Sequence, residues 1–216
     1  HETAESCTME IEAILKLAPV MPVITLERIE QALPLARALL AGGVRALEVT
    51  LRTPVALRAI ELLAGHDEGW VVGAGTVTTA AEYQSVVEAG ARFAVSPGLT
   101  PALAAAGQQG PIPLLPGVMT PSEILNARDH GFGFLKLFPA EQAGGIPFLN
   151  AIHGPLPEIR FCPTGGVGPA NLADYLKLPN VLCVGGSWVT PRRLLRDGHW
   201  SEIEALARAA VTVGKA

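Results

Sequence analysis

Short apolar runs alternate along this chain with longer stretches in which apolar residues recur every three or four positions. The short runs have the length of buried strands, and Gly or Pro stands near most of their ends. Eight such runs are present: 20–25, 46–51, 71–75, 93–96, 113–117, 134–138, 160–164 and 181–184. We predict that each of them forms a strand.

The longer stretches between these runs have helical periodicity and marked ends. Thr120-Pro121-Ser122-Glu123 is typical of a helix start, and Gly42-Gly43 and Gly131 are typical of helix ends. We predict helices over 27–41, 53–64, 79–89, 121–130 and 169–176, a terminal helix over 200–213, and an extra helix over 9–17.

Strands that alternate with helices predict a parallel sheet. Eight strand–helix units predict closure into an α/β, (β/α)8 TIM barrel, with the helix at 9–17 capping its bottom. We expect residues 1–216 to form this one domain and residues 1–8 to be a flexible segment. The alternative is an open doubly wound sheet, which is less favoured because no Gly-x-Gly-x-x-Gly follows the first run.

Composition narrows the function. The net charge is −4 with no basic block, which argues against nucleic-acid binding, and no apolar stretch is long enough to span a membrane. The three cysteines form no Cys-x-x-Cys pair and indicate a reduced, cytoplasmic protein, in which Cys162 and Cys183 are small core residues. The five histidines lack ligand spacing, so we expect no metal site.

Lys136 is the only charged residue in the run from Gly133 to Pro139. Burial of an ammonium group in apolar surroundings favours the neutral, nucleophilic amine, and such an amine can form a Schiff base with a carbonyl compound. The alternative is a lysine that reaches solvent or pairs with an acid.

Other predicted strands also carry polar side chains on one face, as the strand of Lys136 does. Alternation places Glu48 and Arg52 on one face of the second run, and Thr76 and Thr164 follow the same pattern in the third and seventh. These faces should point into the barrel near the carboxyl ends of the strands, where barrel enzymes have their active sites. A buried Glu48–Lys136 ion pair with no catalytic role is the alternative.

Two Gly-Gly pairs follow the last two strands: Gly165-Gly166 in the first case, and Gly185-Gly186, followed by Ser187, in the second. Glycines let backbone N–H groups approach an anion, and barrels often bind phosphate in these two loops. Tight turns would also explain single glycine pairs. A phosphate site, a Schiff-base lysine, a nearby Glu and an Arg that can clamp a carboxylate together indicate aldol cleavage or condensation of a phosphorylated keto acid.

Several motifs, in this order, resemble those of one enzyme family, the 2-keto-3-deoxy-6-phosphogluconate (KDPG) aldolases, whose members often also cleave 2-keto-4-hydroxyglutarate (KHG). The resemblance covers about residues 20–191. Its motifs are Glu48-Val49-Thr50-Leu51-Arg52-Thr53, Gly73-Ala74-Gly75-Thr76-Val77, Ser96-Pro97-Gly98, Leu115-Pro116-Gly117, Lys136-Leu137-Phe138-Pro139-Ala140 and Pro163-Thr164-Gly165-Gly166-Val167.

The resemblance implies a class I aldolase that cleaves KDPG to pyruvate and D-glyceraldehyde 3-phosphate without metal or cofactor. It implies that Lys136 forms the Schiff base and that Glu48 is the general acid/base. The other implied roles are carboxylate binding by Arg52 and Thr76, a pocket wall of Phe138 and Pro97, hydroxyl contacts from Thr164, and phosphate binding by Gly165, Gly166, Gly186 and Ser187. A cytoplasmic homotrimer is also implied.

Three alternatives remain at this point. A sister aldolase could prefer KHG or the galactonate epimer of KDPG, because stereochemical preference depends on pocket shape. A phosphate-binding barrel isomerase or epimerase would need paired acid/base groups or a metal. A non-catalytic phosphosugar-binding module would keep the glycine loops but have no need of Lys136.

Overall fold

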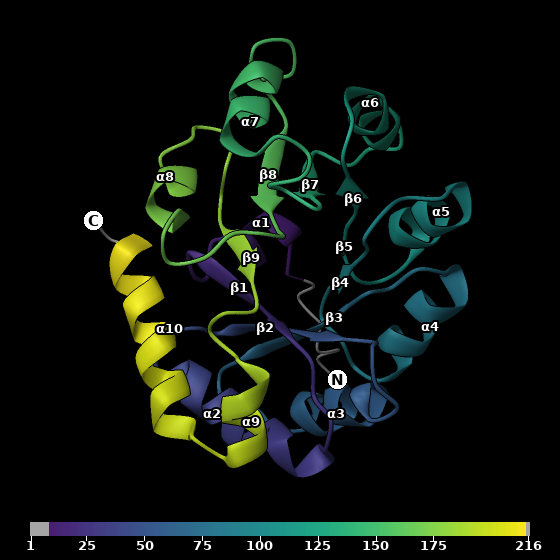
Figure 1. The fold of residues 1–216 in the computed structure, drawn as a ribbon. Coiled ribbons are helices and arrows are strands. Elements are labelled where there is room, and N and C mark those ends of the chain that lie inside the picture. Colours follow the sequence, from purple (N-terminus) through teal and green to yellow (C-terminus); the bar gives the residue numbers. More distant parts are fainter. Residues whose placement is uncertain (1–8, 215–216) are drawn as a thin grey trace, which may run out of the picture.

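A computed structural model describes residues 9–214. The expected flexible segment, residues 1–8, lies outside the described residues. Strands occupy the middle of the molecule and helices surround them (Figure 1). The strands are β1 Val20–Ile24, β2 Ala46–Thr50, β3 Val71–Gly75, β4 Ala94–Val95, β5 Leu114–Leu115, β6 Gly117–Val118, β7 Phe134–Leu137, β8 Arg160–Pro163 and β9 Val184–Gly186.

Within residues 9–214, one helix precedes the first strand, helices connect all successive strands except β5 and β6, and two helices follow the last strand. They are α1 Ile11–Leu15, α2 Ala32–Ala41, α3 Ala56–Ala64, α4 Ala80–Glu88, α5 Pro101–Gln109, α6 Pro121–Asp129, α7 Gly145–His153, α8 Leu172–Leu176, α9 Arg192–Asp197 and α10 Trp200–Gly214, with a 3-10 turn, η1, at Ile29–Gln31. The terminal helix α10 packs against α2, α8 and α9.

All strand pairs are parallel. One sheet has the order β5-β4-β3-β2-β1-β9, and a second has the order β6-β7-β8. Two isolated bridges, Phe161 to Val181 and Thr164 to Gly185, join the second sheet to the segment that contains β9. The predicted parallel α/β architecture is therefore confirmed, and the sheet curls strongly.

Two predicted strands differ from the structure. The run 113–117 is split, because Pro116 has no N–H for a ladder bond and separates β5 from β6. The strand predicted at 181–184 begins three residues before the observed strand, β9. The backbones of Gly185 and Gly186 both pair with β1. Glycine, which we interpreted as the end of the strand, is inside the strand here.

Three predicted helices begin later than expected. The helices predicted from residues 27, 53 and 169 begin at Ala32, Ala56 and Leu172, after η1 in the first case and after turns in the other two. By contrast, the Thr120 hydroxyl accepts a hydrogen bond from Glu123 N at 3.2 Å, so α6 begins at Pro121 as predicted.

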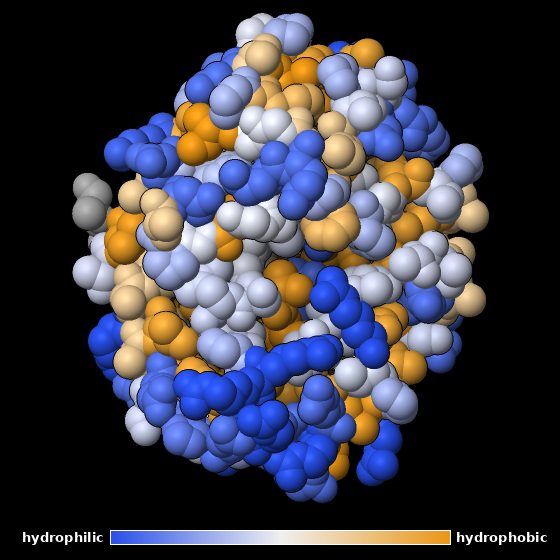
Figure 2. Space-filling view, viewed as in Figure 1, coloured by the Kyte–Doolittle hydropathy of each residue, from blue (hydrophilic) through white to orange (hydrophobic). Residues whose placement is uncertain are grey.

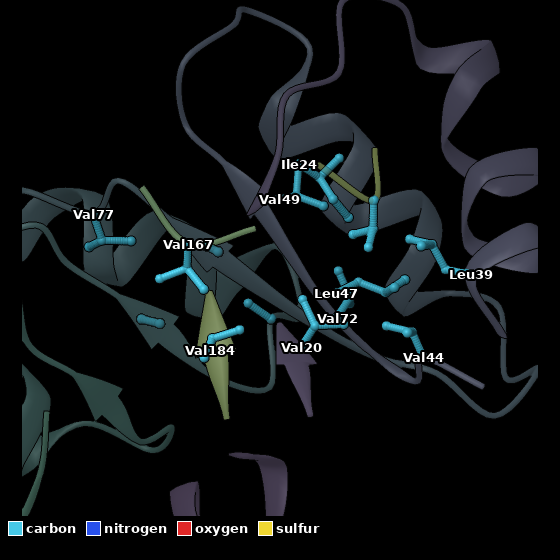
Figure 3. Packing of buried hydrophobic residues seen from close by; sticks show 14 of the residues in the cluster. Val20, Ile24, Leu39, Val44, Leu47, Val49, Val72, Val77, Val167 and Val184 are labelled. Carbon is cyan, nitrogen blue, oxygen red and sulfur yellow. The ribbon is translucent and has the colours of Figure 1, made fainter. Parts of the chain in front are cut away.

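The core has two layers that follow strand alternation. Side chains on the outer face of the sheet, such as Leu47, Val49, Val72 and Val184, pack against the helices (Figure 3). Inside the curled sheet, Phe93, Val95, Leu115, Cys162 and Cys183 form a second cluster with Ile14 and Leu15 of α1. The predicted capping helix therefore closes the amino-terminal end of the strands, and the opposite end is left for a site.

Candidate active site

Lys136 on β7 and Glu48 on β2 meet inside the curled sheet, although their strands are not neighbours. Lys136 Nζ lies 3.9 Å from Glu48 Oε1, and the two side chains are only 5% and 3% exposed. This distance is beyond a direct hydrogen bond. Glu48 Oε1 has no hydrogen-bond partner within residues 9–214. The pair is thus close enough to exchange a proton through one bridging molecule.

Small residues make room for this pair. On the strands beside Lys136, Gly117 and Cys162 are its register partners. A methyl group on Gly75 would overlap the Glu48 carboxylate, so only glycine at residue 75 allows the carboxylate its observed place. The position of Glu48 on β2 opposite Lys136 therefore depends on the missing side chain at Gly75 on β3.

Burial determines the acid–base character of Glu48. Desolvation raises the pKa of the Glu48 carboxyl group, and the positive charges of Lys136 and Arg52 lower it only in part. A raised pKa makes the ionised carboxylate a stronger base and keeps more of the group protonated at a given pH, and both properties favour general acid–base catalysis.

The Lys136 side-chain nitrogen also lies over an aromatic ring. Its Nζ lies 4.8 Å from the centre of the Phe138 ring, within the range of a cation–π contact. Both residues line the cavity described below, so the ring is an apolar neighbour of the nitrogen there.

Arg52 and Thr76 form the polar edge of the site. Arg52 Nε donates a 3.1 Å hydrogen bond to Thr76 Oγ1, while its terminal nitrogens have no partner among residues 9–214. Thr76 has a φ of +57°, which is rare for a β-branched residue and costs about 1–3 kcal/mol. Strain of this kind is concentrated at functional sites. Here the strained residue is the one whose hydroxyl accepts the hydrogen bond from Arg52.

A cavity of about 150 Å³ opens above Lys136. Eight of the predicted site residues line it: Arg52, Lys136, Phe138, Thr164, Gly165, Gly166, Gly186 and Ser187. Glu48 and Thr76 lie behind the lining and touch it through Lys136 and Arg52. Pro97 is not part of the lining, and its backbone instead lies against Gly117.

Two lining residues, Val23 and Val167, were not predicted, and a third, Gly185, belongs to the second predicted Gly-Gly pair. Val23 lies directly opposite Glu48 in the β1–β2 register, so strand alternation could have indicated it. Val167 lies in the loop after β8, where no periodic pattern indicates which residues face the cavity, and Gly185 lies in the middle of β9.

Figure 2 shows a small hydrophobic recess near the centre of the face that it draws. Strongly hydrophilic side chains gather below it, over α9.

Among residues 9–214, no three His, Cys, Asp or Glu side chains come together as metal ligands would. No helix in that range is both long and apolar enough to cross a membrane.

The sequence matches the model of the family described as "KDPG and KHG aldolase" over residues 11–206. The chain belongs to this family. A relative named 2-dehydro-3-deoxy-phosphogluconate aldolase, from Dickeya dadantii, is 52% identical over 200 residues, which cover 93% of this chain and 94% of the relative.

Two solved structures of KDPG aldolases are similar to this chain in both sequence and fold. The KDPG aldolase of Legionella pneumophila, with pyruvate captured at low pH as a covalent carbinolamine intermediate, has 50% identity and a TM-score of 0.93. It covers 94% of this chain, and 98% of its own chain is matched. The KDPG aldolase of Zymomonas mobilis with 3-phosphoglycerate has 44% identity, a TM-score of 0.89 and coverages of 95% and 97%.

Proposed function

We propose that this protein is a class I aldolase that cleaves KDPG to pyruvate and D-glyceraldehyde 3-phosphate. The observation that carries the proposal is the buried amine of Lys136, 3.9 Å from an unpartnered carboxylate oxygen and open to a cavity. The relative that captured pyruvate as a carbinolamine supports the same chemistry.

The reaction begins when the Lys136 amine adds to the C2 carbonyl of the keto acid. Glu48, acting through a water molecule, gives a proton to the carbonyl oxygen, and loss of water from the carbinolamine leaves an iminium ion. The ionised Glu48, again acting through water, takes the proton of the C4 hydroxyl, the C3–C4 bond breaks, and its electron pair flows into the iminium nitrogen. The aldehyde departs, Glu48 gives the proton to C3 of the enamine, and addition of water to the resulting iminium ion releases pyruvate and the Lys136 amine.

Two sets of lining groups suit a substrate with an anion at each end. Arg52, held by Thr76, offers free guanidinium N–H groups to the pyruvyl carboxylate. Gly165, Gly166, Gly186 and Ser187 line the same cavity, and backbone N–H groups of such loops can bind a phosphate. Phe138 supplies an apolar wall beside the reacting carbon, and Thr164, which also lines the cavity, would meet the substrate hydroxyls.

We also propose that the two sheets form one closed (β/α)8 barrel. Its support is that β5 and β6 are separated only by Pro116 and act as one strand, and that two bridges link β8 to the segment of β9. A homotrimer in the cytoplasm is a further proposal, and it is supported by the family resemblance.

The family description also names KHG, so cleavage of this unphosphorylated keto acid is a second candidate activity. Steady-state rates with KDPG, its galactonate epimer and KHG would rank the three substrates. A higher kcat/KM for either of the latter two would replace KDPG as the main substrate.

Reductive trapping tests the imine. Pyruvate with borohydride should add one pyruvyl group, map to Lys136 and abolish activity. The matched control is Lys177→Met, because Lys177 is a solvent-exposed lysine paired with Asp174: this variant should be labelled normally, whereas Lys136→Met should not be labelled. Labelling at another lysine, or none, would refute the mechanism.

A further inference from the structure

The glycine loop after β8 turns its carbonyl groups away from the cavity. Gly165 O accepts a hydrogen bond from Glu141 N at 3.1 Å. Gly166 O accepts one from the side-chain nitrogen of Asn171, Nδ2, at 3.1 Å. Gly165 and Gly166 have φ values of +102° and +79°, which glycine adopts freely and which allow both carbonyls to face outward.

Asn171 uses both ends of its amide on this loop. While Nδ2 donates to Gly166 O, the side-chain oxygen Oδ1 accepts a 2.8 Å hydrogen bond from Gly168 N. One side chain therefore fixes the loop on both sides of Val167. Aspartate has the same length but offers two acceptors, so it could keep only the bond from Gly168.

Fixing these carbonyls also fixes the next N–H groups. In a trans peptide the C=O and N–H bonds point to opposite sides of one plane. With Gly165 O held by Glu141 and Gly166 O held by Asn171, the N–H groups of Gly166 and Val167 point the other way. Within residues 9–214 neither of these two N–H groups donates to a protein acceptor.

The side chain of Val167 anchors the loop from its other side. It is only 9% exposed and belongs to the outer core layer, beside Val184 (Figure 3). Gly166 and Val167 both line the cavity. With the Val167 side chain in the core and the carbonyls turned outward, the lining that these residues offer includes two free backbone donors.

We propose that Asn171 is a positioning residue for phosphate recognition: it touches no substrate atom but aims the Val167 N–H at the phosphate group. This inference rests on the proposed function, since it needs a phosphorylated substrate in the cavity. An unphosphorylated substrate such as KHG would not use these donors.

The test compares KDPG with KHG in Asn171→Ala. Loss of one well-aimed hydrogen bond to a charged group should raise KM for KDPG about 10-fold or more, with kcat within about twofold. The kcat/KM for KHG and the trapping of pyruvate at Lys136 should stay within about twofold of wild type. Inorganic phosphate, used as a competitive inhibitor, should bind more weakly by a similar factor.

Asn171→Asp keeps the acceptor for Gly168 N. It replaces the Nδ2 donor by an oxygen that faces the Gly166 carbonyl oxygen, and it adds a negative charge near the phosphate. It should therefore raise KM for KDPG more than Asn171→Ala does, and it decides the question if the alanine variant does not fold. Asn150→Ala, on the exposed side of α7, is the control and should behave as wild type.

An unchanged KM for KDPG in both variants, or equal losses with KDPG and KHG, would overturn the positioning role. A wild-type enzyme that traps no pyruvate, or whose activity inorganic phosphate does not inhibit, would instead overturn the proposed function and this inference with it.

Discussion

Replacing Glu48 by Gln is the most direct probe of the buried pair. Glutamine keeps the size of the side chain but removes its ability to move a proton. Because 3.9 Å separates Oε1 from Lys136 Nζ, the carboxylate does not hold the nitrogen by a direct hydrogen bond. We therefore expect Lys136 to remain able to form the imine with pyruvate in Glu48→Gln.

The distance also sets the size of the expected loss. Two unit charges at this separation interact by about 4 kcal/mol at an effective dielectric constant of about 20. That energy corresponds to roughly three powers of ten in rate if Glu48 supports a positively charged iminium. General acid–base catalysis contributes a similar factor of about 10² to 10⁴. Turnover of KDPG should therefore fall by about 10² to 10⁴-fold.

Stability should respond to pH in a defined direction. Burial raises the pKa of Glu48 above its unfolded value, so the folded state binds more protons than the unfolded state between the two values. Stability from the protonated carboxyl is fully present below the unfolded pKa and is lost as pH rises through the folded pKa. Relative to Glu48→Gln, the wild type should lose unfolding free energy over that window.

Steady-state turnover, borohydride trapping and urea unfolding at several pH values measure these effects. Glu61→Gln, on the exposed surface of α3, is the control and should match wild type in all three. Wild-type turnover in Glu48→Gln would remove Glu48 from the mechanism. A stability difference that is independent of pH would contradict the raised pKa.

Three other perturbations test the surroundings of the pair. Gly75→Ala places a methyl group against the Glu48 carboxylate, so turnover should fall by at least about tenfold while trapping at Lys136 persists; unchanged turnover would show that the carboxylate can move without loss. Arg52→Lys loses the planar fork, and KM for pyruvate in the condensation direction should rise about tenfold, whereas an unaltered KM would assign the carboxylate to another group. EDTA should leave turnover unchanged, and a loss that a divalent ion restores would favour a metal-dependent aldolase.

Local sequence patterns were sufficient to predict much of the fold. The alternation of apolar runs with helical stretches predicted the parallel sheet, and strand alternation separated Leu135 and Leu137, which pack outward, from Lys136, which points inward. Each of these properties depends on neighbours along the chain. Where two local signals competed, as at Pro116 or Gly185, the predicted boundaries shifted, because cross-strand hydrogen bonding decided which residues pair.

The sequence by itself determined the chemistry available to this protein: one lysine in an apolar strand, a glutamate on an inward face, and glycine pairs at the ends of the last two strands. Only the tertiary structure decided that Glu48 and Lys136 face each other across the curled sheet. It also decided that Thr76 adopts a strained backbone to orient Arg52, and that Asn171 holds the glycine loop. Distances between strands that are not neighbours depend on the curvature of the whole sheet, and this curvature is the sum of many weak contacts that no single segment encodes.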